Sequence, residues 1–216
     1  GNKVAGAAGQ LAGSVTGANT ATLAAAVEQS ADTTYRTSYT PTNVGTDQVA
    51  ITLNSTAISG SPYTSTVSAG AGVPGQTTAV VPNGTAGTAT TITITVRDAG
   101  GNKVAGAAAQ LAGSVTGANT ATLAAAVQQA DTTYTTSYTP TNTGTDQVAI
   151  ALGGSAISGS PYTSLVGAGS GVPGNTTAVV PNGTAGSPTA ITITVRDAGG
   201  NKVTGAAAQL AGSVTG

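Results

Sequence analysis

A sequence repeat of about one hundred residues constrains this chain more than any other feature. The run GNKVAGAAGQLAGSVTGANTATLAAAV begins at Gly1, recurs at Gly101 with one substitution, and begins again at Gly200 as GNKVTGAAAQLAGSVTG. The two intervals are 100 and 99 residues. A unit of this length exceeds the roughly 20–50 residues of a solenoid repeat and matches a whole small domain. The sequence therefore predicts a string of equivalent domains.

Two short runs that contain Gly and Pro, AGVPG at Ala71 and SGVPG at Ser170, have the composition of stiff linkers. Boundaries placed there divide the chain into three copies of the repeat: an incomplete first copy at 1–70, a complete central copy at 71–169, and an incomplete third copy at 170–216. We expect the chain to be a window cut from a longer array. Completion of the incomplete copies by neighbouring chains, as in strand exchange, is the alternative.

Alternating β-branched residues predict strands with one buried face. In Thr91–Val96 every second residue is Ile or Val and the others are Thr, and Val148, Ile150 and Leu152 alternate in the same way. Short runs of this kind recur between turns rich in Gly and Asn, without a long helical periodicity, so the expected fold class is all-β. The segment Ala121–Gln128 is ambiguous, because its Ala-rich composition favours a helix while its alternation fits a strand.

Three motifs of the central copy resemble the filamin-type immunoglobulin repeat. They are ITITVRDAGGNKV at Ile92–Val104, TTYTTSYTPTNTG at Thr132–Gly144 and ISGSPYTSLV at Ile157–Val166. The resemblance implies tandem immunoglobulin-like (filamin-type) β-sandwiches with about seven strands per domain. It also implies that Ala121–Val127 forms strand D of the repeat and not a helix.

The resemblance further implies a groove for partner peptides between strands C and D, at Gly106–Ser114 and Thr120–Val127. Small side chains along these segments would leave a shallow edge, to which another strand could add by backbone hydrogen bonds. The residues predicted to form this strand-addition groove are Gly106, Ala108, Gln110, Ala112, Thr122, Ala124 and Ala126.

Composition argues against several classes of function. Charged residues make up 6% of the chain and the net charge is −1, so the sequence offers no basic surface for nucleic acid or an anionic membrane. His and Cys are absent, which removes the usual general bases and nucleophiles. No apolar run reaches the length of a membrane span. We expect no enzymatic activity, no cofactor and no metal site.

Two kinds of polar residue have competing interpretations. Asp98 and Asn102 flank a Gly-rich turn that could offer oxygen ligands to Ca²⁺, but only one carboxylate is present there. We therefore expect a turn in which both side chains bond their own backbone. Tyrosines such as Tyr134 and Tyr138 could stack on sugars, but we expect them in the core, where bulky side chains are otherwise scarce.

Four positions match the acceptor pattern for N-glycosylation, in which Ser or Thr follows two residues after Asn. They are Asn83, Asn182, Asn54 and Asn175. Asn83 and Asn182 occupy the same turn in successive copies, and a plain Asn-Gly turn without sugar is the other interpretation there.

The sequence predicts a structural repeat module of a long extracellular or cell-surface fibre, stalk or adhesin, acting through domain–domain and lateral contacts. Faces coated with Thr and bearing few charges would repel one another little, so that arrays could pack side by side. The expected partners are copies of itself and cell-surface or matrix components. The alternatives are an intracellular filamin-like scaffold that binds peptides by strand addition, and a Thr-rich surface that recognises glycan or ice.

Overall fold

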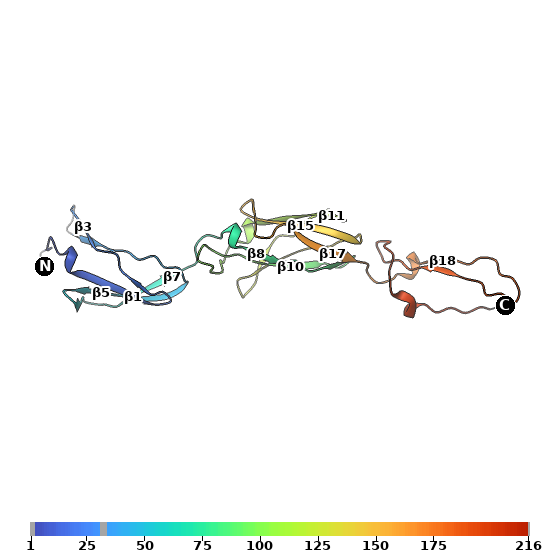
Figure 1. Cartoon of the computed structure of the whole chain (residues 1–216), viewed down its shortest axis with the longest axis horizontal. Coiled ribbons are helices and arrows are strands. Elements are labelled where there is room, and N and C mark those ends of the chain that lie inside the picture. The colour runs from blue at the N-terminus through green and yellow to red at the C-terminus, as the bar shows by residue number, and fades with distance from the viewer. Residues whose placement is uncertain (1–2, 31–33, 216) are drawn as a thin grey trace. The chain divides into compact units, whose positions relative to one another are not determined.

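The structure is a computed structural model that describes residues 3–30 and 34–215. Its elements are β-strands and short 3₁₀ helices (Figure 1). Contacts group the chain into two compact units, which are Gly1–Ala71 with Asp98–Val104 and Gly72–Arg97 with Ala105–Gly216. The turn that begins at Asp98 is therefore part of the same compact unit as the first copy of the repeat.

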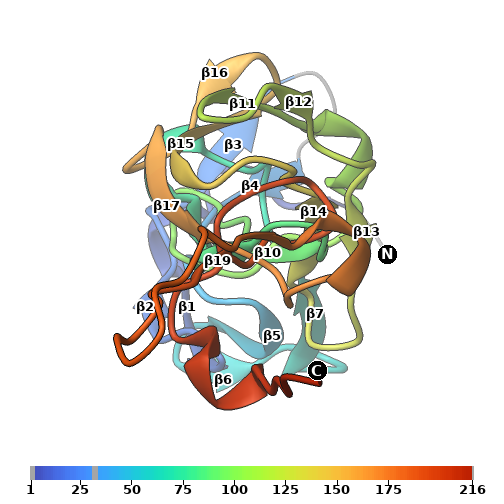
Figure 2. The same cartoon turned by 90° about the vertical axis from the view of Figure 1, so that its right-hand side faces the viewer.

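The central copy folds as two sheets packed face to face. Its strands are β8 Thr78–Val80, β9 Gly84–Thr85, β10 Thr90–Thr95, β11 Leu111–Gly117, β12 Ala121–Thr122, β13 Val127–Gln128, β14 Tyr134–Tyr138, β15 Gly144–Leu152, β16 Ser155–Ala156 and β17 Tyr162–Gly167. One sheet has the order β13-β14-β10-β8, and the other has the order β12-β11-β15-β17-β9 with β16 paired to β15. In Figure 2 β11 and β12 lie on one side of this copy, and β10 and β14 lie on the other.

Alternation along the strands places the core between the two sheets. On β10 the side chains of Ile92 and Ile94 are 0% and 1% exposed, whereas the side chain of Thr91 is exposed. β15 buries every second residue from Asp146 to Leu152. Tyr134 and Tyr138 on β14 are also buried, which confirms the prediction that they belong to the core.

The first copy contains the strands that correspond to β11–β17 of the central copy. They are β1 Leu11–Gly17, β2 Ala21–Thr22, β3 Val27–Gln29, β4 Thr34–Arg36, β5 Gly45–Leu53, β6 Thr56–Ala57 and β7 Tyr63–Val67. β1, β2, β5, β6 and β7 form one sheet, and β3 pairs with β4. The register is preserved between copies, since Val15 pairs with Val49 as Val115 pairs with Val148.

The third copy contributes one strand pair. β18 Thr177–Val179 pairs antiparallel with β19 Thr192–Thr194, in the same way as β8 pairs with β10. The 3₁₀ helices of the chain are η1 Ala8–Gln10, η2 Pro74–Gln76, η3 Ala108–Gln110, η4 Pro173–Asn175 and η5 Ala206–Gln209. The strand pair and the 3₁₀ turns thus recur in the third copy, whereas residues 210–215, the equivalents of β11, form no strand there.

The prediction that Ala121–Val127 is strand and not helix is confirmed in part, because the segment is not helical but is divided into β12 and β13. β12 pairs with β11, whereas β13 pairs with β14 in the other sheet. Between them the backbone changes sheet, because the Leu123 N–H donates to the Gly113 carbonyl and the Ala124 N–H donates to the Ser137 carbonyl. A segment whose consecutive amides bond opposite layers cannot form a single strand.

Two short segments rich in Gly, Ala or Pro form turns. η3 immediately precedes β11, so the Ala-rich residues before Leu111 are not part of that strand. In the run AGVPG the last residues enter η2, and the Val73 N–H donates to the Arg97 carbonyl at 2.7 Å. The alternation pattern does not reveal the bonds of such turns.

Candidate functional site

A buried carboxylate organises one end of the central copy. Asp146 on β15 faces inward and is 0% exposed. Its carboxylate accepts hydrogen bonds from the Asn119 N–H at 2.8 Å, from Asn119 Nδ2 at 3.0 Å and from the Tyr138 hydroxyl at 3.0 Å. Burial raises the pKa of the Tyr138 hydroxyl, so this group remains a donor at neutral pH. Because an unpartnered buried charge is strongly unfavourable, these donors are what permits Asp146 to lie in the core.

Asn119 connects this carboxylate to the loop between β14 and β15. Its Oδ1 accepts from the Thr141 N–H at 2.8 Å and from the Asn142 N–H at 2.9 Å, and its Nδ2 also donates to the Asn142 carbonyl at 2.9 Å. Three bonds from one side chain fix the backbone of this loop. The Thr141 carbonyl and the Thr143 N–H are thereby held ready to bond another segment.

A turn from the third copy of the repeat packs on this loop. Asn201 Nδ2 donates to the Thr141 carbonyl at 2.7 Å, and the Thr143 N–H donates to Asn201 Oδ1 at 3.2 Å. The approach is so close that a Cβ on Gly199 would lie 2.7 Å from the Thr141 oxygen. Glycine at this position is therefore what permits the contact.

The Asp197 side chain stabilises the turn that contains Asn201 and also bonds the backbone of Gly169. Its side chain is 2% exposed, and its carboxylate accepts from the Asn201 N–H at 2.8 Å, from Asn201 Nδ2 at 2.9 Å and from the Gly169 N–H at 2.9 Å. Burial acts to raise the pKa of Asp197, but the bonds from Asn201 and Gly169 outweigh it, and the pKa lies below its usual range. We call Thr141, Thr143, Gly169, Asp197 and Asn201 the repeat joint.

The same joint forms in the unit that contains the first copy. Asn102 Nδ2 donates to the Thr42 carbonyl at 2.7 Å, the Val44 N–H donates to Asn102 Oδ1 at 3.3 Å, and the Gly70 N–H donates to Asp98 Oδ2 at 2.9 Å. The Asn102 side chain, with a further contribution from the Gly70 N–H, holds the pKa of Asp98 below its usual range. Two occurrences with equivalent partners indicate that the joint follows from the repeated sequence.

The sequence pattern indicates the turn of the joint but not the buried pair of Asn119 and Asp146 beneath the loop. Asn119 and Asp146 recur as Asn19 and Asp47, which form the same bonds at 2.8 Å and 3.0 Å. The recurrence of a polar pair in a chain with so few charged residues was the available signal. The bonded residues are 27 positions apart in the central copy, so their contact could not be inferred from spacing alone.

The predicted turn at Asp98 has the expected local bonds. The Asn102 N–H donates to Asp98 Oδ1 at 2.8 Å, and Asn102 Nδ2 donates to both carboxylate oxygens at 3.0 Å. Among residues 3–30 and 34–215, no three Asp, Glu, His or Cys side chains gather as metal ligands do. Within the same residues no helix combines the length and apolar character needed to cross a membrane.

The Asn residues of the predicted glycosylation sites lie in turns and differ in their bonding. Asn83 is exposed, and its Oδ1 accepts a backbone N–H bond from β17 at 3.0 Å. Asn182 is exposed in the corresponding turn of the third copy, and Asn54 lies in the turn after β5 with a φ of 48°. Asn175 Nδ2 donates to the Asp197 carbonyl at 2.8 Å. An N-linked sugar is attached to Nδ2, so attachment at Asn175 would disturb the bond that this atom donates. At Asn83 the bond from β17 is accepted by Oδ1, and a sugar on Nδ2 would leave it in place.

The residues of the predicted strand-addition groove separate into two groups. Gly106, Ala108 and Gln110 lie in or before η3, whereas Ala112, Ala124 and Ala126 line a cavity of about 10 Å³ beside β11. Thr122 is exposed on β12. The Leu123 side chain covers this part of β11, since a Cβ on Gly113 would lie 2.5 Å from Leu123 Cδ1.

Comparison with known families identifies the repeat. The Filamin/ABP280 repeat family matches residues 2–64 and 65–163. The chain therefore belongs to the filamin-repeat family, and the prediction of tandem immunoglobulin-like sandwiches is confirmed. No curated protein matches the chain.

Solved structures with the same fold include bacterial surface proteins. FdeC, an Escherichia coli adhesin, is 29% identical over 90% of this chain and 64% of its own, with a TM-score of 0.69. InvD of Yersinia pseudotuberculosis is 22% identical over 89% of this chain and 61% of its own, with a TM-score of 0.53. Invasin, a bacterial integrin-binding protein, is 17% identical over 90% of this chain and 40% of its own, with a TM-score of 0.51. The latter two show likeness of fold alone, and this chain spans less than two thirds of each of the three.

Proposed function

We propose that this chain is a structural repeat module of a long extracellular or cell-surface fibre, stalk or adhesin. The repeat joint is the observation that most supports the proposal. Asn102 and Asn201 make the same bond to the loop of the preceding copy, to Thr42 and Thr141 respectively. Equivalent joints at successive copies would couple them mechanically, as nearest-neighbour interfaces do in repeat proteins.

The surface location rests on similarity to an adhesin. At 29% identity FdeC is the one neighbour described above whose likeness extends beyond fold, and it is an adhesin of Escherichia coli. The division of the chain at 1–70, 71–169 and 170–216 is part of the same proposal, since each copy would be one bead of the array. No catalytic role is proposed, because repeats of a structural family match residues 2–64 and 65–163.

Lateral contacts between arrays are the second element of the proposal. The outward face of β11, β15 and β17 exposes small or uncharged side chains, which are Ala112, Ser114, Thr116, Thr145, Ala149, Thr163 and Leu165. A face without charge meets little repulsion from a second face of the same kind. Copies of this chain, together with cell-surface or matrix components, are the proposed partners, and Asn83 and Asn182 are the proposed sites of glycan.

Surface location can be tested directly on the source cells. Protease added to intact cells should cleave the native protein, and antibodies against the central copy should label cells that have not been permeabilised. Full protection until lysis would contradict the proposal and favour the intracellular scaffold that binds peptides by strand addition. Mass spectrometry of the native protein would establish whether Asn83 or Asn182 carries sugar.

Mechanical coupling can be tested with spin labels at cysteines introduced in the central and third copies, since the chain has no native Cys. Wild-type protein should give a narrow distance distribution, and the variant Asn201→Ala should give a broad one. Asn83→Ala, which alters an exposed turn outside the joint, is the matched control. Equal widths in all three proteins would remove the joint as the source of coupling.

A further inference from the structure

The outward face of β11, β15 and β16 in the central copy has an open hollow with a volume of about 390 Å³. A row of three alanines crosses it, because Ala151 on β15 pairs with Ala112 on β11 and with Ala156 on β16. Gly154, in the turn between β15 and β16, also lines the hollow. Side chains no larger than a methyl group along this row leave the surface of the sheet low there.

An exposed apolar side chain stands on the same face, at its other end. Leu165 on β17 is 56% exposed, whereas its neighbours Ser164 and Val166 are buried. Successive side chains of a strand point to opposite faces, so Leu165 points outward. It lies opposite Thr145 of β15. A protruding leucine and a hollow lined by small residues are the two halves of a packed contact, and here a single face carries both.

The differences between the first and central copies concentrate around these two features. Residues 31–75 align with residues 130–174, and nine positions differ, of which six fall between 151 and 167. Three of the six bear on the hollow or the leucine. They replace Thr52 by Ala151, Ser55 by Gly154 and Thr66 by Leu165. The two changes at the hollow reduce the size of the side chain, and the third change supplies the leucine.

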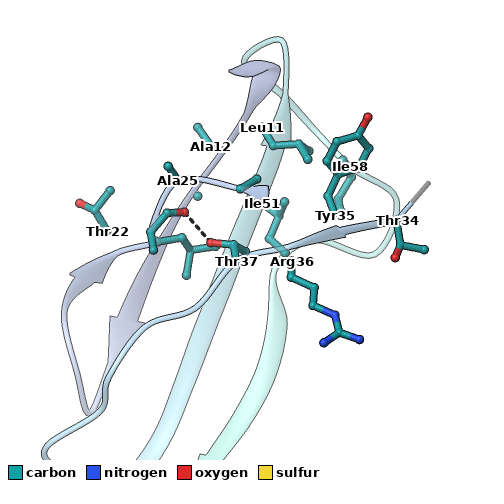
Figure 3. A pocket seen from close by; sticks show the side chains of 14 residues that line it. Leu11, Ala12, Thr22, Ala25, Thr34, Tyr35, Arg36, Thr37, Ile51 and Ile58 are labelled. Atoms are coloured by element: carbon teal, nitrogen blue, oxygen red, sulfur yellow. Dashed lines mark hydrogen bonds between the residues drawn. The ribbon is translucent and has the colours of Figure 1, made fainter. Parts of the chain in front are cut away.

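In the first copy the corresponding row is covered. Thr52 occupies the position of Ala151, and its hydroxyl donates to the Ala12 carbonyl at 3.3 Å. Ala12 is on the outward side of β1, and Figure 3 shows it pointing away from Leu11, which is on the other side of the strand. Thr66 stands at the position of the exposed leucine. The combination of hollow and leucine is therefore a property of the central copy and does not follow from the fold alone.

The leucine and the hollow are placed so that a twofold axis exchanges them. β11 pairs with one edge of β15, and both β16 and β17 pair with the other edge. Leu165 lies beside Thr145, whereas Ala156 lies beside Ala151, six residues and about 20 Å farther along β15. An axis that crosses the strands at the level of Val148, midway between them, brings each of these positions onto the other.

We propose that two copies of this chain pack face to face through this sheet, with Leu165 of each copy seated over Ala156 and beside Ala151 of the other. The contact is isologous and closes at two copies, because each copy supplies the same surface. It rests on the lateral contacts of the proposed function, to which it gives a partner and a register. Asp146, the charged residue of these four strands, points inward and is 0% exposed, so the two faces meet without repulsion.

The size of the face sets the strength of the contact. Three strands about 4.8 Å apart and about seven residues long cover roughly 350 Å² on each copy. The contact therefore belongs to the weak class, which buries less than about 1,200 Å² in total. Copies held in one fibre meet at effective concentrations on the order of millimolar, at which a weak contact is populated.

The first test is the molar mass of the full 216-residue chain against concentration, measured by sedimentation equilibrium up to about 1 mM. The mass of the wild-type protein should rise from 20.2 kDa toward twice that value. Leu165→Thr and Ala151→Thr each introduce the residue of the first copy. Each should weaken association about tenfold or more, because one removes the leucine and the other fills the hollow.

The matched control for these variants is Val80→Thr. Val80 on β8 is 70% exposed and belongs to the other sheet of the central copy. Its replacement removes a comparable apolar side chain and should leave association as in the wild type. An unchanged urea midpoint in each variant would show that all of them fold.

The second test traps the predicted register with disulfides, since the chain has no native Cys. The twofold axis brings Thr145 of one copy onto Ala151 of the other. A mixture of the single variants Thr145→Cys and Ala151→Cys should therefore form a mixed disulfide at least roughly tenfold faster than either variant bonds to itself. Two copies of Thr145 would lie about 20 Å apart across the axis, beyond the reach of a disulfide.

Three results would overturn the inference. They are a wild-type chain that stays monomeric throughout, association as strong in Leu165→Thr as in Val80→Thr, and a mixed disulfide that forms no faster than the disulfides of the single variants. The proposed surface location is tested separately, by protease on intact cells. A chain that is cleaved on intact cells but associates independently of Leu165 would remove this inference and leave the surface location standing. A chain that is protected in cells but pairs through Leu165 would do the reverse.

Discussion

Asn201 donates from Nδ2 to the carbonyl of Thr141 at 2.7 Å, across a separation of 60 residues. Asn102 makes the same bond to Thr42 at the same separation and distance. In each case one amide side chain also accepts a backbone N–H from the same loop, at 3.2 Å and 3.3 Å. A single Asn per repeat therefore bonds both the acceptor and the donor of the loop in the preceding copy.

Replacement of this Asn should loosen the loop at one amide. In Asn201→Ala the Thr143 N–H loses its acceptor, so its hydrogen exchange should become roughly tenfold faster, as expected from the loss of about 1–2 kcal/mol of hydrogen bonding. The Ile150 N–H, which bonds the Ser160 hydroxyl at 2.9 Å within the central copy, should exchange as before. Unchanged exchange at Thr143 would show that the joint is not formed in solution.

The buried carboxylate should be the most sensitive polar group of the central copy. In Asp146→Asn one carboxylate oxygen becomes an NH₂ group, which would face the donors of Asn119 or Tyr138 and leave a buried group unsatisfied. We expect a loss of about 2–4 kcal/mol in the stability of this copy, measured as a lower urea midpoint for the transition reported by buried tyrosines. Asp131→Asn in an exposed turn is the matched control and should change stability by less than about 0.5 kcal/mol.

Sequence patterns were sufficient to predict the strands and their buried faces, but not the hydrogen bonds between copies of the repeat. The alternation of Ile92, Ile94 and Val96 predicts a strand with one buried side, because successive side chains of a strand point to opposite faces, which is a property of the local backbone. The bonds of Asn201 depend on the position of a loop 60 residues away. Nothing in local spacing encodes that distance.

The division of Ala121–Val127 into two strands escaped the sequence pattern for a similar reason. Its residues alternate as in a strand, but Leu123 and Ala124 bond opposite sheets. Whether such a segment stays in one sheet or crosses to the other depends on the distance between the two sheets, which is set by the packed core. The filamin resemblance supplied the fold class, whereas the position of the crossing required the structure.

Acid should weaken the joint. The pKa values of Asp98 and Asp197 are lower in the folded chain than the ordinary Asp value of about 3.9. A carboxyl whose folded pKa is depressed stabilises the fold fully above its unfolded pKa, and this contribution is lost as the pH falls through the folded value. The joint should therefore be intact above about pH 4 and weaken below about 3.9.

Nuclear magnetic resonance can follow this titration at the amides that bond the two carboxylates. The Gly70 and Gly169 N–H signals should shift with midpoints below about 3.9, because they donate to Asp98 and Asp197 at 2.9 Å. Asp197→Asn should abolish the titration at Gly169 and leave that at Gly70. Midpoints at or above the ordinary value would contradict the structure of the joint.

The close approach at Gly199 gives the sharpest steric test of the joint. A Cβ there would lie 2.7 Å from the Thr141 carbonyl oxygen, a contact with backbone that no side-chain rotation relieves. Gly199→Ala should therefore push the turn away from the loop and cost about 1–3 kcal/mol, the usual range for overpacking. Gly174→Ala is the matched control, since a Cβ at Gly174 meets nothing within 4 Å. Hydrogen exchange at Thr143 should accelerate in Gly199→Ala and stay unchanged in Gly174→Ala, and equal exchange in the two variants would mean that the third copy does not hold its turn against the loop.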